Sequence, residues 1–333
     1  MRALVSAGAD VNLQANNGSS PLIMASHEGH IDCVKLPIQH DAEVDTRNNR
    51  GATPLYWAAS MGHIEVVQFL IEQHADVNAC ENDGRSCLFD ASFHGHTDVV
   101  RALVSAGADV NLQDNDGASP LIMASQEGHI DCVKLLIHHG AEVDTHNNEG
   151  ATPLYWAASM GHIEVVQLLI EQHADVNACD NDGRSCLLRA AFNGHTDVVR
   201  ALMSAGADVN LQCNDDSSPL TAASQEGHID GVKLLVEHGT EVDTRNNEGA
   251  APLYWAGSEG HIEIVQFLIE QHADVNACDN DGRSCLWTAP FLGHTDVVRA
   301  LVYAGVRLTY KPMMVLLLSS WLVRKDTLIV LIV

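Results

Sequence analysis

Apolar residues occur in short groups along the chain, separated by glycines and polar turn-forming residues. In the stretch that begins at Asp114, the sequence Asn115-Asp116-Gly117 favours a turn, because glycine readily takes positive φ angles. Ser119 and Pro120 then favour a helix start, since a serine hydroxyl caps free backbone amides and proline suits the first helical position. The apolar residues that follow predict a short helix that ends at Gly128.

A second helix is expected from His129, because Ile130, Val133 and residues 135–137 supply one apolar face. Gly140 should end this helix, and residues 141–144 should return in an extended conformation to the next turn. Neither helix can bury its apolar face alone. The unit is therefore predicted to stack on its neighbours along one dimension.

The same pattern recurs with a period of 33 residues, and nine units fit the frame from Ala15 to about Lys311. In each unit a Gly-His pair separates the two predicted helices, and a glycine stands in the turn except at Asp216. The turn glycines are Gly18, Gly51, Gly84, Gly117, Gly150, Gly183, Gly249 and Gly282, and the histidines of the pairs are His30, His63, His96, His129, His162, His195, His228, His261 and His294.

The combination of Ser/Thr-Pro-Leu, Gly-His, Val-x-x-Leu-Leu and Gly-Ala-Asp-Val-Asn at this period resembles the ankyrin repeat family. The resemblance covers about nine-tenths of the chain and implies an all-α solenoid of stacked helix-turn-helix units with β-turn or hairpin loops. We therefore expect the second half of a repeat in residues 1–14, nine ankyrin repeats in residues 15–311 and an apolar non-repeat tail in residues 312–333.

A second period of 99 residues lies on the first, because three unit types, named A, B and C here, recur in that order. This predicts a block of three repeats present in three copies, called blocks 1, 2 and 3. Type A carries Cys33 and Cys132, with Gly231 in the third copy; type B carries Tyr56-Trp57, Tyr155-Trp156 and Tyr254-Trp255; type C carries Arg85-Ser86-Cys87, Arg184-Ser185-Cys186 and Arg283-Ser284-Cys285.

The two ends of the chain depart from the pattern. Residues 2–12 match residues 101–111, the second half of a type C unit, which favours a fragment, an isoform or an incomplete gene model. In the tail, Arg324-Lys325-Asp326 places three charges in the apolar run. Each charge costs about 2.5–3.5 kcal/mol at the centre of a membrane span, so a spanning helix is not expected. The tail is expected to cover the last repeat, or to be sequence read past the natural end of the array.

Acidic side chains outnumber basic ones, with 44 Asp and Glu against 18 Lys and Arg and a formal net charge of −26. Such a surface repels phosphate backbones and anionic lipids, so neither nucleic acid nor a membrane is an expected partner. It favours a basic protein face, although the excess acid can equally serve solubility alone. The nine cysteines form no dense framework, which favours a reducing compartment, the cytoplasm or the nucleus. We expect a monomer.

Residues capable of catalysis or metal binding occur in patterns that a repeat explains. His27-Glu28-Gly29-His30 has one residue between the glutamate and the second histidine, where a zinc-protease helix needs two. The Gly-His histidines belong to layers about 8–10 Å apart, too far to share a zinc ion, so each is expected to bond neighbouring loop backbone. Cys87, Cys186 and Cys285 are expected to be buried small residues, and a redox role with the cysteine seven positions before each stays open. No nucleotide-binding or nucleophile motif is present, so we expect no enzyme activity, no metal and no cofactor.

The resemblance also implies where a partner binds, because ankyrin proteins usually hold it on the concave side formed by turn tips and first helices. Phe93, Phe192 and Phe291 are candidate hot spots if exposed and core residues if each folds into a neighbouring helix. The Tyr-Trp pairs, which lie about one helical turn before the helix-end positions, are expected to fill the core. The candidate partner-binding residues are Phe93, His94, Gln126, Glu127, Met160, Phe192, Asn193, Gln225, Glu226, Glu259 and Phe291 at helix ends, and Asn115, Asp116, Glu149, Asp182 and Asp215 at turn tips.

The sequence thus predicts a non-enzymatic scaffold or adaptor that binds partner proteins on an acidic concave face. Two alternatives stay open: a substrate-recognition arm of a larger protein, such as a ubiquitin-ligase receptor, a signalling protein or a channel, and a membrane-associated tether held through the tail. Pro37, Asp41 and Pro290 break the pattern of their copies, so the outer units are expected to be the softest.

Overall fold

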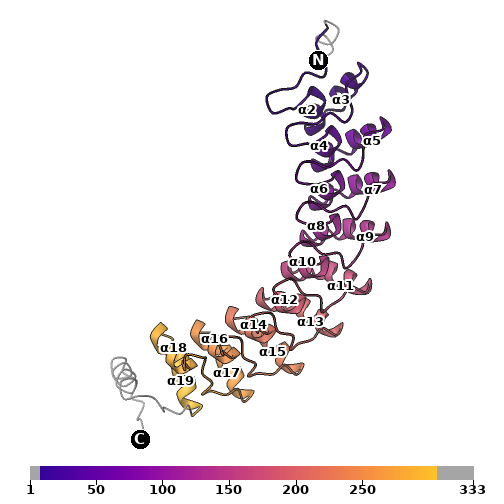
Figure 1. Cartoon of the computed structure of the whole chain (residues 1–333). Helices are drawn as coiled ribbons and strands as arrows, with labels where there is room; N and C mark the ends of the chain where they lie inside the picture. The colour runs from indigo at the N-terminus through magenta and orange to yellow at the C-terminus, as the bar shows by residue number, and fades with distance from the viewer. Residues whose placement is uncertain (1–7, 306–333) are drawn as a thin grey trace. The chain divides into compact units, whose positions relative to one another are not determined.

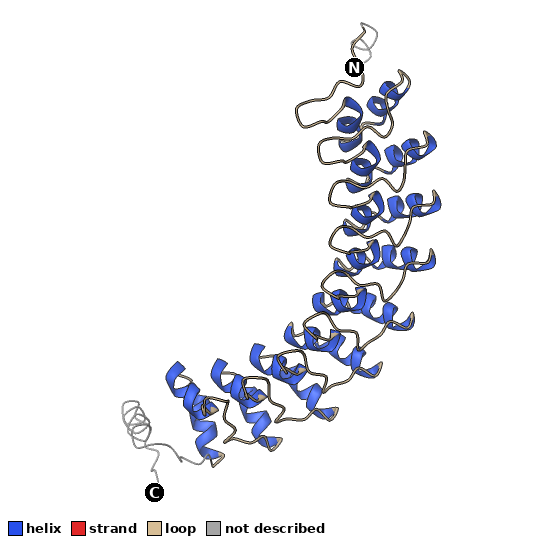
Figure 2. Cartoon of the chain, in the orientation of Figure 1, coloured by secondary structure: helices blue, strands red, loops and turns tan. Residues whose placement is uncertain are grey.

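The computed structural model describes residues 8–305, which form eighteen short α-helices joined by loops (Figures 1 and 2). Each repeat contributes two helices. The first helices are α2 (Pro21–His27), α4 (Pro54–Ser60), α6 (Cys87–Phe93), α8 (Pro120–Gln126), α10 (Pro153–Met160), α12 (Cys186–Phe192), α14 (Pro219–Glu226), α16 (Pro252–Glu259) and α18 (Cys285–Leu292). The second helices are α3 (Ile31–Ile38), α5 (Ile64–Glu72), α7 (Thr97–Ser105), α9 (Ile130–His138), α11 (Ile163–Glu171), α13 (Thr196–Ser204), α15 (Ile229–Glu237), α17 (Ile262–Glu270) and α19 (Thr295–Tyr303).

The chain divides into two compact units, one of residues 1–190 with 200–207 and the other of residues 191–199 with 208–333. In the first unit, α2, α4, α6, α8 and α10 pack each on the next, and α3, α5, α7, α9 and α11 form a second layer beside them (Figure 1). In the second unit, α14, α16 and α18 form the first layer, and α15, α17 and α19 form the second. The predicted all-α array of stacked helix pairs is confirmed.

The first helix of a repeat starts at a side-chain cap. Ser119 Oγ accepts a hydrogen bond from the backbone N–H of Ile122 at 3.3 Å, and Thr152 Oγ1 accepts one from that of Tyr155 at 3.2 Å. Proline occupies the first helical position of α8 and α10, where its missing N–H removes no helix hydrogen bond. The helix starts predicted from the sequence are therefore confirmed.

The histidine of the Gly-His pair connects successive repeats. His129 Nε2 donates a hydrogen bond to the backbone carbonyl of Phe93 in the preceding repeat at 3.0 Å, as the sequence predicted. Within residues 8–305, no group of three or more His, Cys, Asp and Glu side chains is placed to hold a metal ion. The same hydrogen bond is made by His63, His96 and His162 in the first unit and by His228 and His261 in the second.

The loop after the second helix is a turn, so the extended return predicted for residues 141–144 is wrong. The N–H of Thr145 donates to the carbonyl of Glu142 at 3.3 Å. The N–H of Glu142 donates in turn to Asn111 Oδ1 of the preceding repeat at 2.9 Å. Because a side chain of the neighbouring repeat satisfies this amide, the loop needs no strand partner and folds back on itself.

The cysteines fall into two classes. Cys87, Cys186 and Cys285 are buried, as predicted, and burial raises the pKa of the Cys285 thiol to about 12. The cysteine seven positions earlier in each copy is half-buried and forms a single β-bridge with the serine that starts the next helix. These half-buried residues are Cys80, Cys179 and Cys278.

No helix within residues 8–305 is both long and apolar enough to cross a membrane. The predictions made for the apolar tail lie outside the described residues. Pro37 lies inside α3 and Pro290 inside α18, while Asp41 and Asp216 take positive φ angles of 63° and 59° where their copies have glycine.

Candidate partner-binding surface

Turn asparagines form a hydrogen-bonded ladder along the first unit. Asn115 Nδ2 donates to the carbonyl of Asn82 at 3.1 Å, Asn148 Nδ2 to that of Asn115 at 3.1 Å, and Asn181 Nδ2 to that of Asn148 at 2.8 Å. These amides therefore hold neighbouring turns in register. Asn115 was predicted to contact a partner. Its Nδ2 makes one of these bonds between turns, and the contact with a partner stays a prediction.

The acidic turn residues differ in what they bind. Asp114 Oδ1 accepts hydrogen bonds from the N–H groups of Asp116 and Ala118 at 3.0 and 2.8 Å and so closes its own turn. Asp116 and Glu149 are exposed, and their carboxylates make no hydrogen bond or ion pair within the described part of the chain. These two carboxylates are available to a partner.

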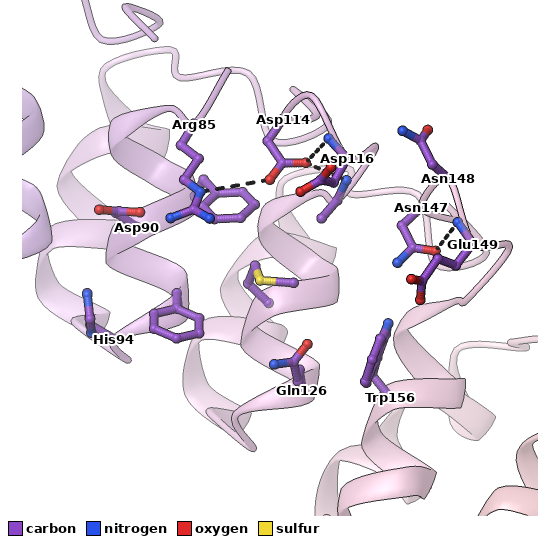
Figure 3. A pocket seen from close by; sticks show the side chains of 14 residues that line it. Arg85, Asp90, His94, Asp114, Asp116, Gln126, Asn147, Asn148, Glu149 and Trp156 are labelled. Carbon is purple, nitrogen blue, oxygen red and sulfur yellow. Dashed lines mark hydrogen bonds and ion pairs between the residues drawn. The ribbon is translucent and has the colours of Figure 1, made fainter. Parts of the chain in front are cut away.

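Helices α6, α8 and α10 and the turns before them enclose a cleft of about 660 Å³, called the Trp156 cleft below. Trp156 lies on one side of it, His94 lies on the other, and Gln126 lies between them (Figure 3). Phe89, Ala118 and Ile122 form the buried apolar cluster beneath, with Met123 and Trp156 packed against it. The cleft is lined by Arg85, Phe89, Asp90, Phe93, His94, Asp114, Asp116, Ala118, Met123, Gln126, Asn147, Asn148, Glu149 and Trp156.

Five of the predicted residues meet in this cleft: Phe93, His94, Asp116, Gln126 and Glu149. They come from three successive repeats, which places helix ends and turn tips around one space. Glu127 is not part of the lining; its Oε1 accepts a hydrogen bond from Gln126 Nε2 at 3.0 Å.

A family model described as ankyrin repeats (3 copies) matches residues 1–81, 44–114, 88–180, 172–246 and 220–311. The chain belongs to the ankyrin repeat family. Ankyrin repeats are generally protein-binding modules and are typically non-catalytic.

The other predicted residues lie outside the Trp156 cleft, and all of them except Met160 belong to ankyrin repeats that do not line it. Asp182 forms an ion pair with Arg184 Nη2 at 2.7 Å, and Asp215 Oδ1 accepts hydrogen bonds from the Cys213 thiol and the Ser217 N–H, both at 2.9 Å. Because these carboxylates are already bonded within the chain, they are poorer partners for another protein than Asp116 and Glu149. Outside the Trp156 cleft lie Met160, which is exposed at the end of α10, Phe192 and Asn193 at the end of α12, Gln225 and Glu226 on α14, Glu259 on α16 and Phe291 on α18.

The three phenylalanines do not share one environment. Phe93 and Phe192 are half-buried, and the Phe93 ring packs edge-on against His94 with a centroid distance of 4.9 Å. Phe291 is 82% exposed and stacks on Trp287 with a centroid distance of 6.2 Å. Phe291 thus meets the condition of exposure on which the hot-spot prediction depended, and its binding role stays a prediction, while Phe93 contributes to both packing and the cleft wall.

The Tyr-Trp pairs are core residues only in part. Tyr155 is buried, and its hydroxyl donates to Asp180 Oδ2 at 2.7 Å. Burial opposes ionisation of Asp180, but this bond and those from Arg184 hold the pKa of Asp180 below its usual value. Trp156 is half-buried and lines the cleft, so the prediction that it fills the core was wrong. Adjacent helical residues point about 100° apart, so both rings of a pair could not face the same core.

Carboxylates outnumber cations around the Trp156 cleft, with Asp90, Asp114, Asp116 and Glu149 against Arg85. The Arg85 guanidinium lies over the Phe89 ring, 5.6 Å from its centroid, and its Nε is 3.9 Å from Asp114 Oδ2. The cleft therefore combines apolar walls with a net negative rim. Arg85 and Asp114 could not be predicted as part of the cleft, because their contact forms only where two repeats meet.

Proposed function

We propose that this chain is a non-enzymatic scaffold that holds partner proteins on the turn tips and first helices of its ankyrin repeats, with the Trp156 cleft as a principal contact. The Trp156 cleft supports this proposal most directly. It offers about 660 Å³ between three repeats, with Trp156, Phe93 and Met123 as walls. Aromatic and flexible apolar side chains in a partly desolvated hollow are typical of the centre of a protein interface.

The charge of the cleft selects among protein partners. Two carboxylates without a partner, Asp116 and Glu149, border the same hollow, and the whole chain carries a formal net charge of −26. A partner with a basic contact surface would associate faster than a neutral or acidic one. Its positive charges would also compensate the desolvation of Asp116 and Glu149 on binding. We therefore propose that the partner contacts this acidic surface with a basic face.

Charge-changing substitutions test the proposal. The double variant Asp116→Lys, Gln126→Lys changes the cleft by three charge units at its rim, and capture of bound proteins by the immobilised chain, measured by quantitative mass spectrometry, should fall about tenfold or more. Both positions accept long side chains, because Asp116 is exposed and Gln126 is half-buried at a helix end.

The matched control makes the same charge change on the second-helix layer. Gln68 on α5 and Asp98 on α7 are exposed, and they line a shallow groove of the first unit together with Arg101. The variant Gln68→Lys, Asp98→Lys should keep its bound proteins. Equal loss from both double variants would assign binding to overall charge and not to the cleft, and an unchanged capture profile in the cleft variant would refute the proposed function.

A further inference from the structure

Resting on the proposed function, we propose that the Trp156 cleft receives an arginine side chain of the partner, stacked over the Trp156 ring. The argument comes from block 1 of the same chain, where the equivalent tryptophan, Trp57, is covered by an arginine of the chain itself.

In block 1, Arg50 occupies the turn before α4 and reaches over the side chain of Trp57. Its Cζ atom lies 5.8 Å from the centroid of the Trp57 ring, within the range of a cation–π contact. Its Nη2 also donates to Glu81 Oε2 at 3.2 Å. The hollow at this place, lined by Arg50, Trp57, Met24 and His27 among others, measures about 380 Å³.

In block 2, the tryptophan is retained but the arginine is not. Trp156 stands where block 1 has Trp57, Met123 where it has Met24, and Glu149 where it has Arg50. The exchange of Arg50 for Glu149 removes the internal cation and puts an unpartnered carboxylate beside the ring. Gln126 also stands where block 1 has His27, whose ring packs edge-on against Trp57 with a centroid distance of 5.1 Å. Block 2 thus keeps the aromatic surface for a guanidinium and gains an acid that would bind it (Figure 3).

The arginines on the turns and first helices of neighbouring repeats in the first unit are engaged elsewhere. Arg85 lies over Phe89, Arg184 pairs with Asp180 and Asp182 at 2.7 Å each, and the Arg189 guanidinium lies 6.0 Å from the centroid of the Tyr155 ring. None of these contacts covers Trp156. The cation that completes the site must therefore come from a partner.

Arginine fits this site better than lysine. A planar guanidinium can stack on an indole ring while its N–H groups form paired hydrogen bonds with a carboxylate. Arg50 combines the same two kinds of contact, since it lies over Trp57 and donates one hydrogen bond to Glu81. An ammonium group is more strongly hydrated and lacks a planar face. Glu149 and Asp116, both on the rim, supply the carboxylates in block 2.

The test uses the full chain and a fluorescent peptide in which arginines alternate with glycine and serine, followed by fluorescence anisotropy. Glu149→Arg places in block 2 the residue that block 1 carries, so it should cover Trp156 without disturbing the fold. The peptide should then bind about tenfold more weakly. Arg50→Glu, the reverse exchange, should uncover Trp57 and add a further binding site. A peptide with citrulline, the neutral isostere of arginine, should bind the unmodified chain at least about tenfold more weakly than the arginine peptide does. The affinity of a lysine peptide should lie between those of the arginine and citrulline peptides.

Glu164→Arg, which makes the same charge change at an exposed position of α11, controls for overall charge and should leave peptide affinity within about twofold. Equal weakening by Glu149→Arg and Glu164→Arg, or equal affinity for the arginine and citrulline peptides, would overturn the arginine site. The scaffold function is tested separately by protein capture. If Asp116→Lys, Gln126→Lys abolishes capture while Glu149→Arg leaves it intact, the binding surface stands and the arginine inference fails; if neither variant affects capture, the proposed function fails as well.

Discussion

At the scale of single residues, the two glycine positions of a repeat differ in how much space surrounds them. Gly128 has a φ of 76°, and a methyl group built on it would lie 2.6 Å from Nδ1 of His162. Gly140 has a φ of 90°, and such a methyl group would meet no atom within 4 Å. The sequence reflects this difference, since every Gly-His pair keeps its glycine while Asp41 takes the place of Gly140 in block 1.

This contrast gives the first prediction at residue scale. Gly140→Ala should reduce the free energy of unfolding by about 1–2 kcal/mol, the penalty for a left-handed backbone conformation. Gly128→Ala should reduce it by about 3 kcal/mol or more, because its methyl group must also displace the His162 ring, which donates to the carbonyl of Gln126 at 2.9 Å. Urea unfolding of the two variants and the unmodified chain measures both losses of free energy. Equal losses would show that the histidine can move aside freely.

Single residues also show what could be predicted from the sequence. The role of His129 followed from spacing alone, since a histidine that recurs at the start of every second helix must serve a contact that also recurs. The asparagine ladder through Asn82, Asn115 and Asn148 was missed, because its hydrogen bonds join turns of different repeats. A repeated asparagine is equally consistent with a turn former and with a bridge between turns.

At the scale of helices, a proline in α3 distinguishes block 1 from its copies. Pro37 is buried inside α3, where block 2 has Leu136 in α9. Proline lacks the N–H that would donate within the helix, and α3 has eight residues where α9 has nine. The prediction that the outer units are the softest has this physical basis and stays a prediction.

Replacing Pro37 with the leucine of its copies tests the prediction that the outer units are the least stable. Pro37→Leu should raise the free energy of unfolding by up to about 3 kcal/mol and slow amide hydrogen exchange in α3. The reciprocal change Leu136→Pro should speed exchange in α9 and its neighbours α7 and α11, since each repeat is stabilised by the adjacent ones. Faster exchange in α3 after Pro37→Leu would mean that the proline ring fills its site better than leucine and that backbone hydrogen bonding is secondary.

Helix ends were predictable and loop conformations were not. Capping by Ser119 and the glycine at position 128 are local signals, so the bounds of α8 follow from the sequence. The turn around Glu142 depends on Asn111 of the repeat before it, and the position of Trp156 at the cleft depends on which neighbour its helix meets. A candidate site built from three repeats is therefore visible only once those repeats are packed.

At the scale of the whole molecule, one histidine of the Gly-His pairs, His96, couples stability to pH. Burial lowers the pKa of His96, its hydrogen bond to the carbonyl of Ser60 opposes this effect, and the neighbouring His94, His129 and His63 lower the pKa further. The folded chain therefore favours neutral His96 more than the unfolded chain does. A depressed pKa means that the unfolded state binds more protons, so this contribution to stability is present above about pH 6.5, the ordinary value, and is lost as the pH falls through the lower folded value.

The pH dependence of unfolding does not by itself isolate this effect, because the surface with a formal net charge of −26 loses self-repulsion on acidification and opposes it. The difference between the unmodified chain and His96→Gln isolates it, since glutamine can still donate to the Ser60 carbonyl but does not titrate. Between about pH 7.5 and pH 5, the advantage of the unmodified chain over His96→Gln in urea unfolding should shrink steadily. The lowered pKa of Asp180 and of Asp279 acts below their ordinary value of 3.8, outside this window. A difference that stays constant across the window would mean that His96 titrates alike in the folded and unfolded chain, and that His96 stabilises the array through its hydrogen bond to Ser60 alone.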